Sequence, residues 1–168
     1  MPWTCTVCGE LHDEQLRDIR AGLPDPVFEI DEVERRERVD SDTDWCRFVD
    51  QNGALRLYVR GVLHLPIKRS DDDFRFGVWV EVGEADFYRL GDLWHDEDGM
   101  ATRPFFGWLA NKLNLYPGTL GLPVALQLRD VHRLPAVILL DAEHPIVVDQ
   151  RRGIDEEQAN RLAETVLH

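Results

Sequence analysis

LRLYVRGVLHL, residues 55–65, alternates apolar and polar side chains, which is the pattern of a β-strand with one buried face. A second stretch, FRFGVWVEV at residues 74–82, alternates in the same way and places Trp79 opposite its apolar positions. The pair Asn52-Gly53, just before the first stretch, is typical of a tight β-hairpin. We therefore expect neighbouring strands here, with a core built from the odd positions of the first stretch and the even positions of the second.

Two segments precede these strands. Residues 45–50 predict a strand that pairs across the Asn52-Gly53 turn. Residues 31–39 open with Asp31 followed three positions later by Glu34, the pattern of a capping box, and predict a short, highly charged helix.

Helical spacing begins after the second long strand. Residues 84–94 and 105–113 carry apolar side chains three and four positions apart, which predicts two amphipathic helices. Residues 124–128 alternate again, and residues 134–141 form a nearly continuous apolar run. Both runs predict strands, the second one central in the sheet.

The C-terminal segment predicts the clearest helix. Asp155 and Gln158 form a capping box, and we expect Leu162 and Val166 to pack the helix on the sheet. Together the patterns predict an α+β fold with a mostly antiparallel sheet of about five strands, inserted helices and a C-terminal amphipathic helix. The length fits one domain over residues 1–168.

The composition restricts the class of partner. The 168 residues carry a formal net charge of −13, from 19 basic and 32 acidic side chains. An acidic excess without a Lys/Arg cluster argues against binding to nucleic acid and to anionic membranes. The longest purely aliphatic run, residues 136–140, is far shorter than a membrane span, and the N-terminus has no secretory pattern. We expect a cytoplasmic protein.

The N-terminus contains the sharpest chemical motif of the chain. Cys5 and Cys8 form a Cys-x-x-Cys turn, Gly9 can take the positive φ that closes it, and His12 follows within reach. We predict a structural zinc knuckle in which Cys46, the remaining cysteine, is the fourth ligand. Residues 1–22 would form an appendage that the metal ties to the first strand. The alternatives are reduced cysteines without a metal, and a redox-active pair.

A second candidate site lies near residue 144. His144 follows Asp141 and Glu143, and a neighbouring carboxylate can fix the tautomer of an imidazole that acts as a base. The alternative is a structural turn. Dinucleotide-binding, Walker, zincin and nucleophile-elbow motifs are all missing from the sequence, which disfavours those classes of enzyme.

Several longer motifs resemble a bacterial family that is known only as a domain of unknown function. The motifs span nearly the whole chain, which implies one family-length domain, and the resemblance implies no activity. The matching residues are Cys5-x-x-Cys8-Gly-x-x-His12, Gly77-Val-Trp79-Val, Phe106-Gly-Trp108-Leu-x-Asn111, Tyr116-Pro-x-Thr119-Leu and His144-Pro-x-x-x-x-Gln150-x-x-Gly153-Ile.

Three functions are consistent with the sequence. The first is a small cytoplasmic binding module with a structural zinc knuckle and a protein partner. The second is an enzyme of unknown reaction with a pocket near His144 and Trp79. The third is an acidic, immunity-like protein that binds a basic protein partner, because opposite charge favours such complexes.

Overall fold

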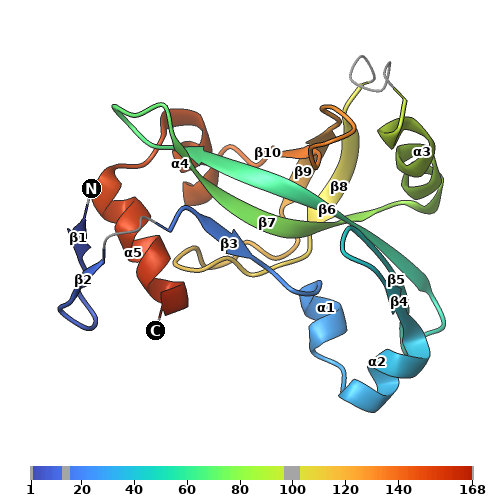
Figure 1. Cartoon of the computed structure of the whole chain (residues 1–168). Coiled ribbons are helices and arrows are strands. Elements are labelled where there is room, and N and C mark those ends of the chain that lie inside the picture. The colour runs from blue at the N-terminus through green and yellow to red at the C-terminus, as the bar shows by residue number, and fades with distance from the viewer. Residues whose placement is uncertain (1, 13–15, 97–102, 168) are drawn as a thin grey trace.

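The centre of the molecule is a closed ring of five strands. The computed structural model describes residues 2–12, 16–96 and 103–167 (Figure 1). The ring runs β6-β7-β8-β9-β10 and returns to β6. Its members are β6 (Leu55–Pro66), β7 (Asp73–Val82), β8 (Phe105–Leu109), β9 (Pro123–Gln127) and β10 (Ala136–Leu139).

The closure of the ring corrects the expected sheet geometry. Four of its pairings are antiparallel, and the closing pair between β10 and β6 is parallel, with Ala136 opposite Val62. Five strands in an up-and-down order cannot close without one parallel pair. The fold is therefore α+β as predicted, but its sheet is a closed barrel and not a simple antiparallel sheet.

Short strands extend the barrel on two sides. β3 (Asp18–Arg20) pairs with β7 in parallel, and β5 (Trp45–Val49) and β4 (Val39–Ser41) continue the sheet beyond β6. A separate hairpin is formed by β1 (Trp3–Thr4) and β2 (Leu11–His12), and it lies beside the C-terminal helix (Figure 1).

The described part of the chain contains five helices. The predicted caps are present: the Asp155 carboxylate accepts from the Gln158 backbone at 2.7 Å, and Asp31 accepts from Glu34 at 2.8 Å. The fourth helix was not expected, and it begins where the sequence suggested a turn at His144. The helices are α1 (Asp25–Phe28), α2 (Glu32–Arg38), α3 (Glu84–Trp94), α4 (Pro145–Arg152) and α5 (Glu156–Leu167).

The core follows the predicted register of the two long strands. Leu57, Leu63, Phe76 and Val80 are buried in the main apolar cluster inside the barrel. The opposite face of the same strands is also covered, because Trp79 lies in a second buried cluster. That cluster also contains Tyr58, Cys46, Phe48, Val27 and Ala110.

Two local expectations were wrong. Residues 105–113 do not form a helix, because their first part is β8, in which Phe106 and Trp108 point outward and their neighbours inward. In α5, Leu162 is buried as expected, but Val166 is 49% exposed and does not pack on the sheet. Among the described residues, no helix is both long and apolar enough to cross a bilayer.

Candidate metal centre

A tight hairpin brings the N-terminal motif into position. In its two-stranded pairing, Trp3 is opposite His12. The turn between them is closed by two backbone hydrogen bonds of 2.9 Å, from the Cys5 N–H to the Glu10 carbonyl and from the Gly9 N–H to the Cys5 carbonyl. Gly9 has a φ of +74°, a conformation that a residue with a Cβ adopts only with strain.

Three donor atoms converge in this hairpin. The sulfur atoms of Cys5 and Cys8 and a ring nitrogen of His12 all lie within 4.8 Å of one another. Cys8 Sγ is 3.5 Å from His12 Nε2, about the separation of two donors in a tetrahedral zinc site with ordinary bond lengths. Thiolate and imidazole ligands suit zinc, whereas magnesium and calcium prefer oxygen ligands. The residues present therefore fit zinc.

The ring of His12 is also held from outside the group. It stacks on the Trp3 indole, with 5.1 Å between the ring centroids and 29° between their planes. Trp3 is itself buried in the main core cluster, as is Cys5. The core thus fixes one ligand directly and a second through a stacked ring, which limits the rearrangement that metal binding requires.

The hairpin is tied to the C-terminal helix by a carboxylate. Thr6 donates its backbone N–H to Glu164 Oε1 at 2.8 Å and its hydroxyl to Glu164 Oε2 at 2.5 Å. Glu164 lies in α5 and is only 7% exposed. A buried carboxylate is costly unless its oxygens are hydrogen-bonded, so this contact specifies where the hairpin sits.

Cys46 does not join the group, which corrects the predicted ligand set. It lies on β5, buried in the second core cluster, across the molecule from β1 and β2 (Figure 1). Burial, with a smaller effect of the nearby Asp40 and Asp42 carboxylates, raises the pKa of its thiol to about 12. The thiol is therefore neutral at physiological pH, whereas a zinc ligand must be a thiolate.

His144 and Trp79, the two residues of the enzyme hypothesis, both make structural contacts. His144 caps α4: its Nδ1 accepts from the Ile146 N–H at 3.2 Å, and its Nε2 lies 2.9 Å from the Pro117 carbonyl. Both ring nitrogens are thus used in holding the chain together. Trp79 is fully buried, with the Arg60 guanidinium 4.4 Å above its ring. Neither side chain offers a free reactive group.

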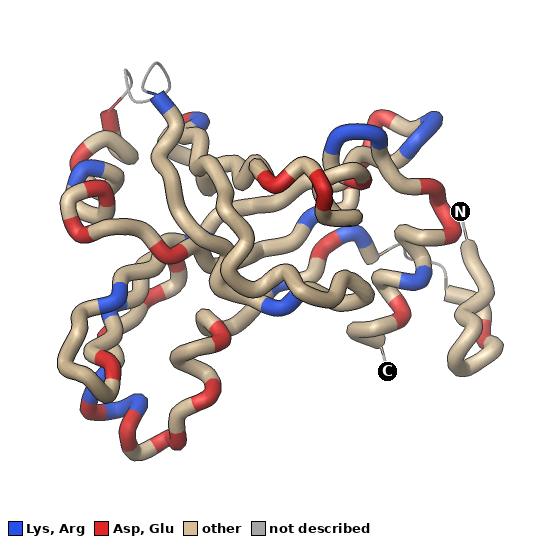
Figure 2. The backbone as a smooth tube through the Cα atoms, turned by 180° about the vertical axis from the view of Figure 1, so that it is seen from behind, with Lys and Arg blue, Asp and Glu red and all other residues tan. Residues whose placement is uncertain are grey.

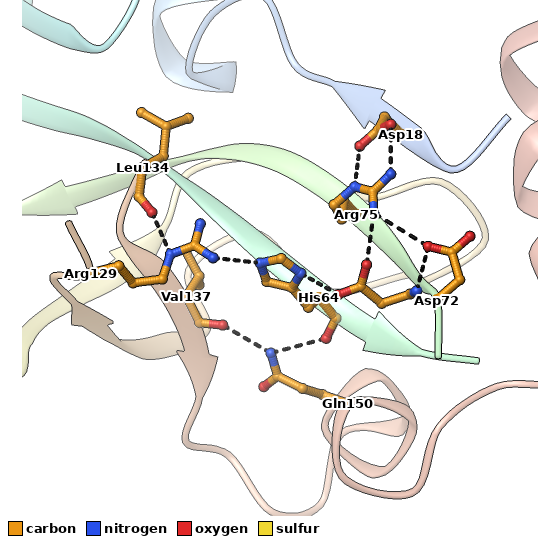
Figure 3. A network of polar contacts seen from close by, with 9 residues as sticks. Asp18, His64, Asp72, Arg75, Arg129, Leu134, Val137 and Gln150 are labelled. Carbon is orange, nitrogen blue, oxygen red and sulfur yellow. Dashed lines mark hydrogen bonds and ion pairs between the residues drawn. The ribbon is translucent and has the colours of Figure 1, made fainter. Parts of the chain in front are cut away.

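The structure also shows a polar network that the sequence analysis missed (Figure 3). His64 on β6 contacts Asp73 on β7, with 2.5 Å between Nδ1 and Oδ2. Arg75, two residues after Asp73, binds that carboxylate at 2.8 Å and pairs with Asp18 on β3. Arg129 approaches the other nitrogen of His64. The hairpin register, which pairs His64 with Arg75, was the signal that could have indicated this cluster.

Comparison with known proteins assigns the family. The chain belongs to the bacterial family described as "Uncharacterized protein conserved in bacteria (DUF2199)", which matches residues 4–154. This confirms the resemblance seen in the motifs. Neither the curated proteins nor the solved structures contain a match.

Proposed function

We propose that this member of the family is a protein-binding module with a structural zinc centre at Cys5, Cys8 and His12. The observation that carries the proposal is the convergence of three zinc-type donors on one hairpin. Cys5 directly follows β1 and His12 ends β2, so a bound metal would join the two strands. Among the described residues the group consists of these three donors, with no fourth Cys, His, Asp or Glu.

The chemistry of the site implies a location. Zinc binds thiolates, and an oxidising compartment would convert Cys5 and Cys8 to a disulfide or a sulfenic acid. No disulfide joins any of the three cysteines in the structure. We therefore include the cytoplasm, a reducing compartment, in the proposal.

The partner that we propose is a basic protein. A hollow of about 350 Å³ lies between β4, β5 and α3, and its lining includes Asp40, Asp42 and Asp92 beside Trp45 and Tyr88. Carboxylates next to aromatic faces suit a Lys or Arg side chain, which can pair with the former and stack on the latter. Nucleic acid and anionic lipid would be repelled by the same charges.

The negative charge of the chain does not by itself mark this surface. Figure 2 shows acidic positions spread along the backbone with basic positions between them. Arg47 also lines the hollow, with its guanidinium 5.8 Å from the centroid of the Tyr88 ring. An incoming cation would displace Arg47 from that ring, so the partner's charge replaces a contact that the free protein already makes.

The metal is tested by elemental analysis of protein that is purified without added metal. We expect near one zinc per chain. Cys8→Ser removes an exposed ligand with little risk to folding and should lower the zinc content strongly, whereas Cys46→Ser should leave it unchanged. Zinc-free wild-type protein, or equal losses in the two variants, would contradict the proposed site.

The partner surface is tested with two variants of equal net charge. D40N/D92N removes two carboxylates from the hollow, and E37Q/E157Q removes two exposed carboxylates elsewhere. The wild-type chain is used to capture basic proteins from its native host, and each variant is then titrated with the purified partner. We expect only D40N/D92N to weaken binding. Equal weakening by both pairs would show an effect of net charge and would exclude the hollow.

A further inference from the structure

His64 and Arg129 face each other on the outside of the barrel, and the proposed zinc module does not use them. His64 is half-buried on β6 between Leu63 and Leu65, which point into the core. Arg129 follows β9, and its Nη1 lies 3.4 Å from His64 Nε2 (Figure 3). The contact is longer than an ordinary N–H···N hydrogen bond, so the two groups meet without a strong bond between them.

The orientation and tautomer of His64 are set from one side. Its Nδ1 lies against the Asp73 carboxylate, which can only accept, so Nδ1 carries the proton. Asp73 is held in turn by Arg75, whose guanidinium binds both oxygens of Asp18 at 2.6 and 3.0 Å. In neutral His64, Nε2 therefore carries a lone pair that points toward Arg129. Protonation would turn it into a second donor.

Arg129 differs from the other half-buried arginines of the sheet. Its Nε donates to the Leu134 carbonyl at 2.8 Å. Within the described ranges no carboxylate lies within 4 Å of its guanidinium, although the chain has 32 acidic residues. Arg56 and Arg75, in contrast, each pair with a carboxylate of the sheet. Burial and the charge of Arg133 lower the pKa of Arg129, and the opposing effects of Asp130 and Asp73 offset this only in part.

We propose that Arg129 and His64 bind a phosphoryl group, either free phosphate or the phosphate of a monoester. Arg129 would donate from its Nη atoms, and protonated His64 would donate from Nε2. When His64 is protonated, its Nε2 and the Nη1 of Arg129 are both donors at a separation of 3.4 Å, and they repel each other. A phosphate that accepts from both groups removes this repulsion and favours the imidazolium. A tetrahedral phosphate can accept from both groups through different oxygens.

Proton uptake by His64 is thus coupled to binding. The groups that act on this proton come from several elements: Asp73 and Arg75 on β7, Arg129 after β9, and Asp18 and Asp72 through Arg75. From α4, Gln150 contributes an uncharged amide to the His64 carbonyl at 3.5 Å. Because bound phosphate stabilises the charged form of the ring, it should favour the imidazolium form of His64.

The test follows the His64 ring by ¹H–¹⁵N NMR during a titration with inorganic phosphate, with sodium chloride holding the ionic strength constant. We expect a saturable change at Nε2, a proton that stays on Nδ1, and a second ring proton on Nε2 in the phosphate-bound protein. Phenyl phosphate serves as the monoester. Tighter binding of phenyl phosphate than of phosphate would identify a monoester ligand, and the reverse would identify free phosphate.

Matched variants separate a built site from a general effect of charge. Arg129→Gln should weaken phosphate binding about tenfold or more, because it removes charge-assisted hydrogen bonds. Arg36→Gln removes an exposed arginine of α2 that pairs with Glu32, and it should leave binding unchanged. His64→Gln, followed by ³¹P NMR, gives an independent measure of the same site. His64 ring signals that phosphate does not change, or equal losses in the two arginine variants, would overturn the proposal.

The site is also independent of the metal. Cys8→Ser should remove zinc and leave phosphate binding intact, so failure of one proposal does not decide the other. If phosphate instead bound only to the zinc-loaded protein, the ligand would be at the metal and the assignment to Arg129 and His64 would be wrong.

Discussion

The environment of a single cysteine decides whether its thiol can serve as a ligand. Cys8 is exposed on a turn beside His12, whereas Cys46 is buried among apolar side chains, with a thiol pKa of about 12. The sequence places Cys5, Cys8 and His12 within eight residues, so their proximity could be predicted from local chain geometry. The position of Cys46 depends on the tertiary fold. Its choice as the fourth ligand rested only on its being the remaining cysteine, which says nothing about that position.

The ion pair between Asp18 and Arg75 gives a prediction for pH. The hydrogen bond from Arg75 holds the pKa of Asp18 below its ordinary value of about 3.9, and burial opposes this only in part. A lowered pKa means that the stabilising contribution is present above the ordinary pKa and is lost as the pH falls through the lowered one. Both side chains are partly exposed, so solvent screening keeps the contribution small.

We therefore expect Asp18→Asn to reduce the free energy of unfolding by less than about 1 kcal/mol at pH 7. The difference from the wild type should shrink as the pH falls from 4 to 2. Denaturant unfolding at several pH values measures it, with Asp71→Asn as the control for a carboxylate of the neighbouring turn. A deficit that grows in acid would show that the pair does not lower the pKa of Asp18.

At the scale of elements, alternation over long strands could be predicted but short aromatic runs could not. β6 and β7 have ten or more residues each, so their period of two is unambiguous. In β8 the five residues FFGWL satisfy helical and strand spacing equally. The barrel resolves this ambiguity: Phe105 and Leu109 fill the interior, and Gly107 is the inward residue between them.

Gly107 is required by the close approach of β7. A Cβ built at this position would lie 2.5 Å from the Glu81 carbonyl oxygen and 2.6 Å from a methyl carbon of Val80. The first contact is with backbone, which cannot move away without disturbing the pairing of β7 and β8. Gly107→Ala should therefore lower the free energy of unfolding by about 1–3 kcal/mol. Chemical denaturation measures this, and a loss below about 0.5 kcal/mol would show that the strands can separate at no cost.

Gly91 gives the opposite prediction, because it lies inside α3 with room around it. Its nearest neighbour for an added Cβ is a ring carbon of Trp45 at 4.0 Å, an ordinary contact distance. A glycine inside a helix costs about 1 kcal/mol relative to alanine. We expect Gly91→Ala to raise the melting temperature by about 2–4 °C. A lower melting temperature would indicate that α3 and Trp45 pack more tightly than the 4.0 Å contact indicates.

At the scale of the molecule, the sequence predicted the fold class and not its closure. The closing pair between β10 and β6 involves positions more than seventy residues apart, Ala136 and Val62, and its parallel direction has no local signal. The same is true of the network around His64, which gathers Asp73 from one strand and Arg129 from beyond another. Helix α4 could have been predicted from the sequence, because a proline such as Pro145 directly after a capping residue is typical of a helix start. The interpretation of this segment as a turn overlooked that signal.

The arrangement of hairpin and barrel determines which parts of the fold the loss of zinc should destabilise. The barrel core closes through strand pairing and through side chains such as Leu57, Phe76 and Leu126, none of which is a metal ligand. The hairpin, in contrast, has two short strands, and among the described residues its connections to the rest of the fold include Trp3, Cys5 and the bonds between Thr6 and Glu164. A two-stranded hairpin of this size is not stable alone.

Removal of zinc by a chelator should therefore loosen the hairpin and leave the barrel folded. Hydrogen exchange is the measurement: the amides of Cys5 and Gly9, which close the turn, should lose protection, while those of β6 and β7 should keep theirs. Glu164→Gln weakens the second attachment of the hairpin, so chelation should expose the turn more in this variant than in the wild type. Lower pH should have the same effect as the chelator, because protons compete with zinc for thiolates and imidazole. A barrel that unfolds together with the hairpin would mean that the metal holds the whole core, and a turn that stays protected without zinc would mean that Trp3 and Glu164 suffice.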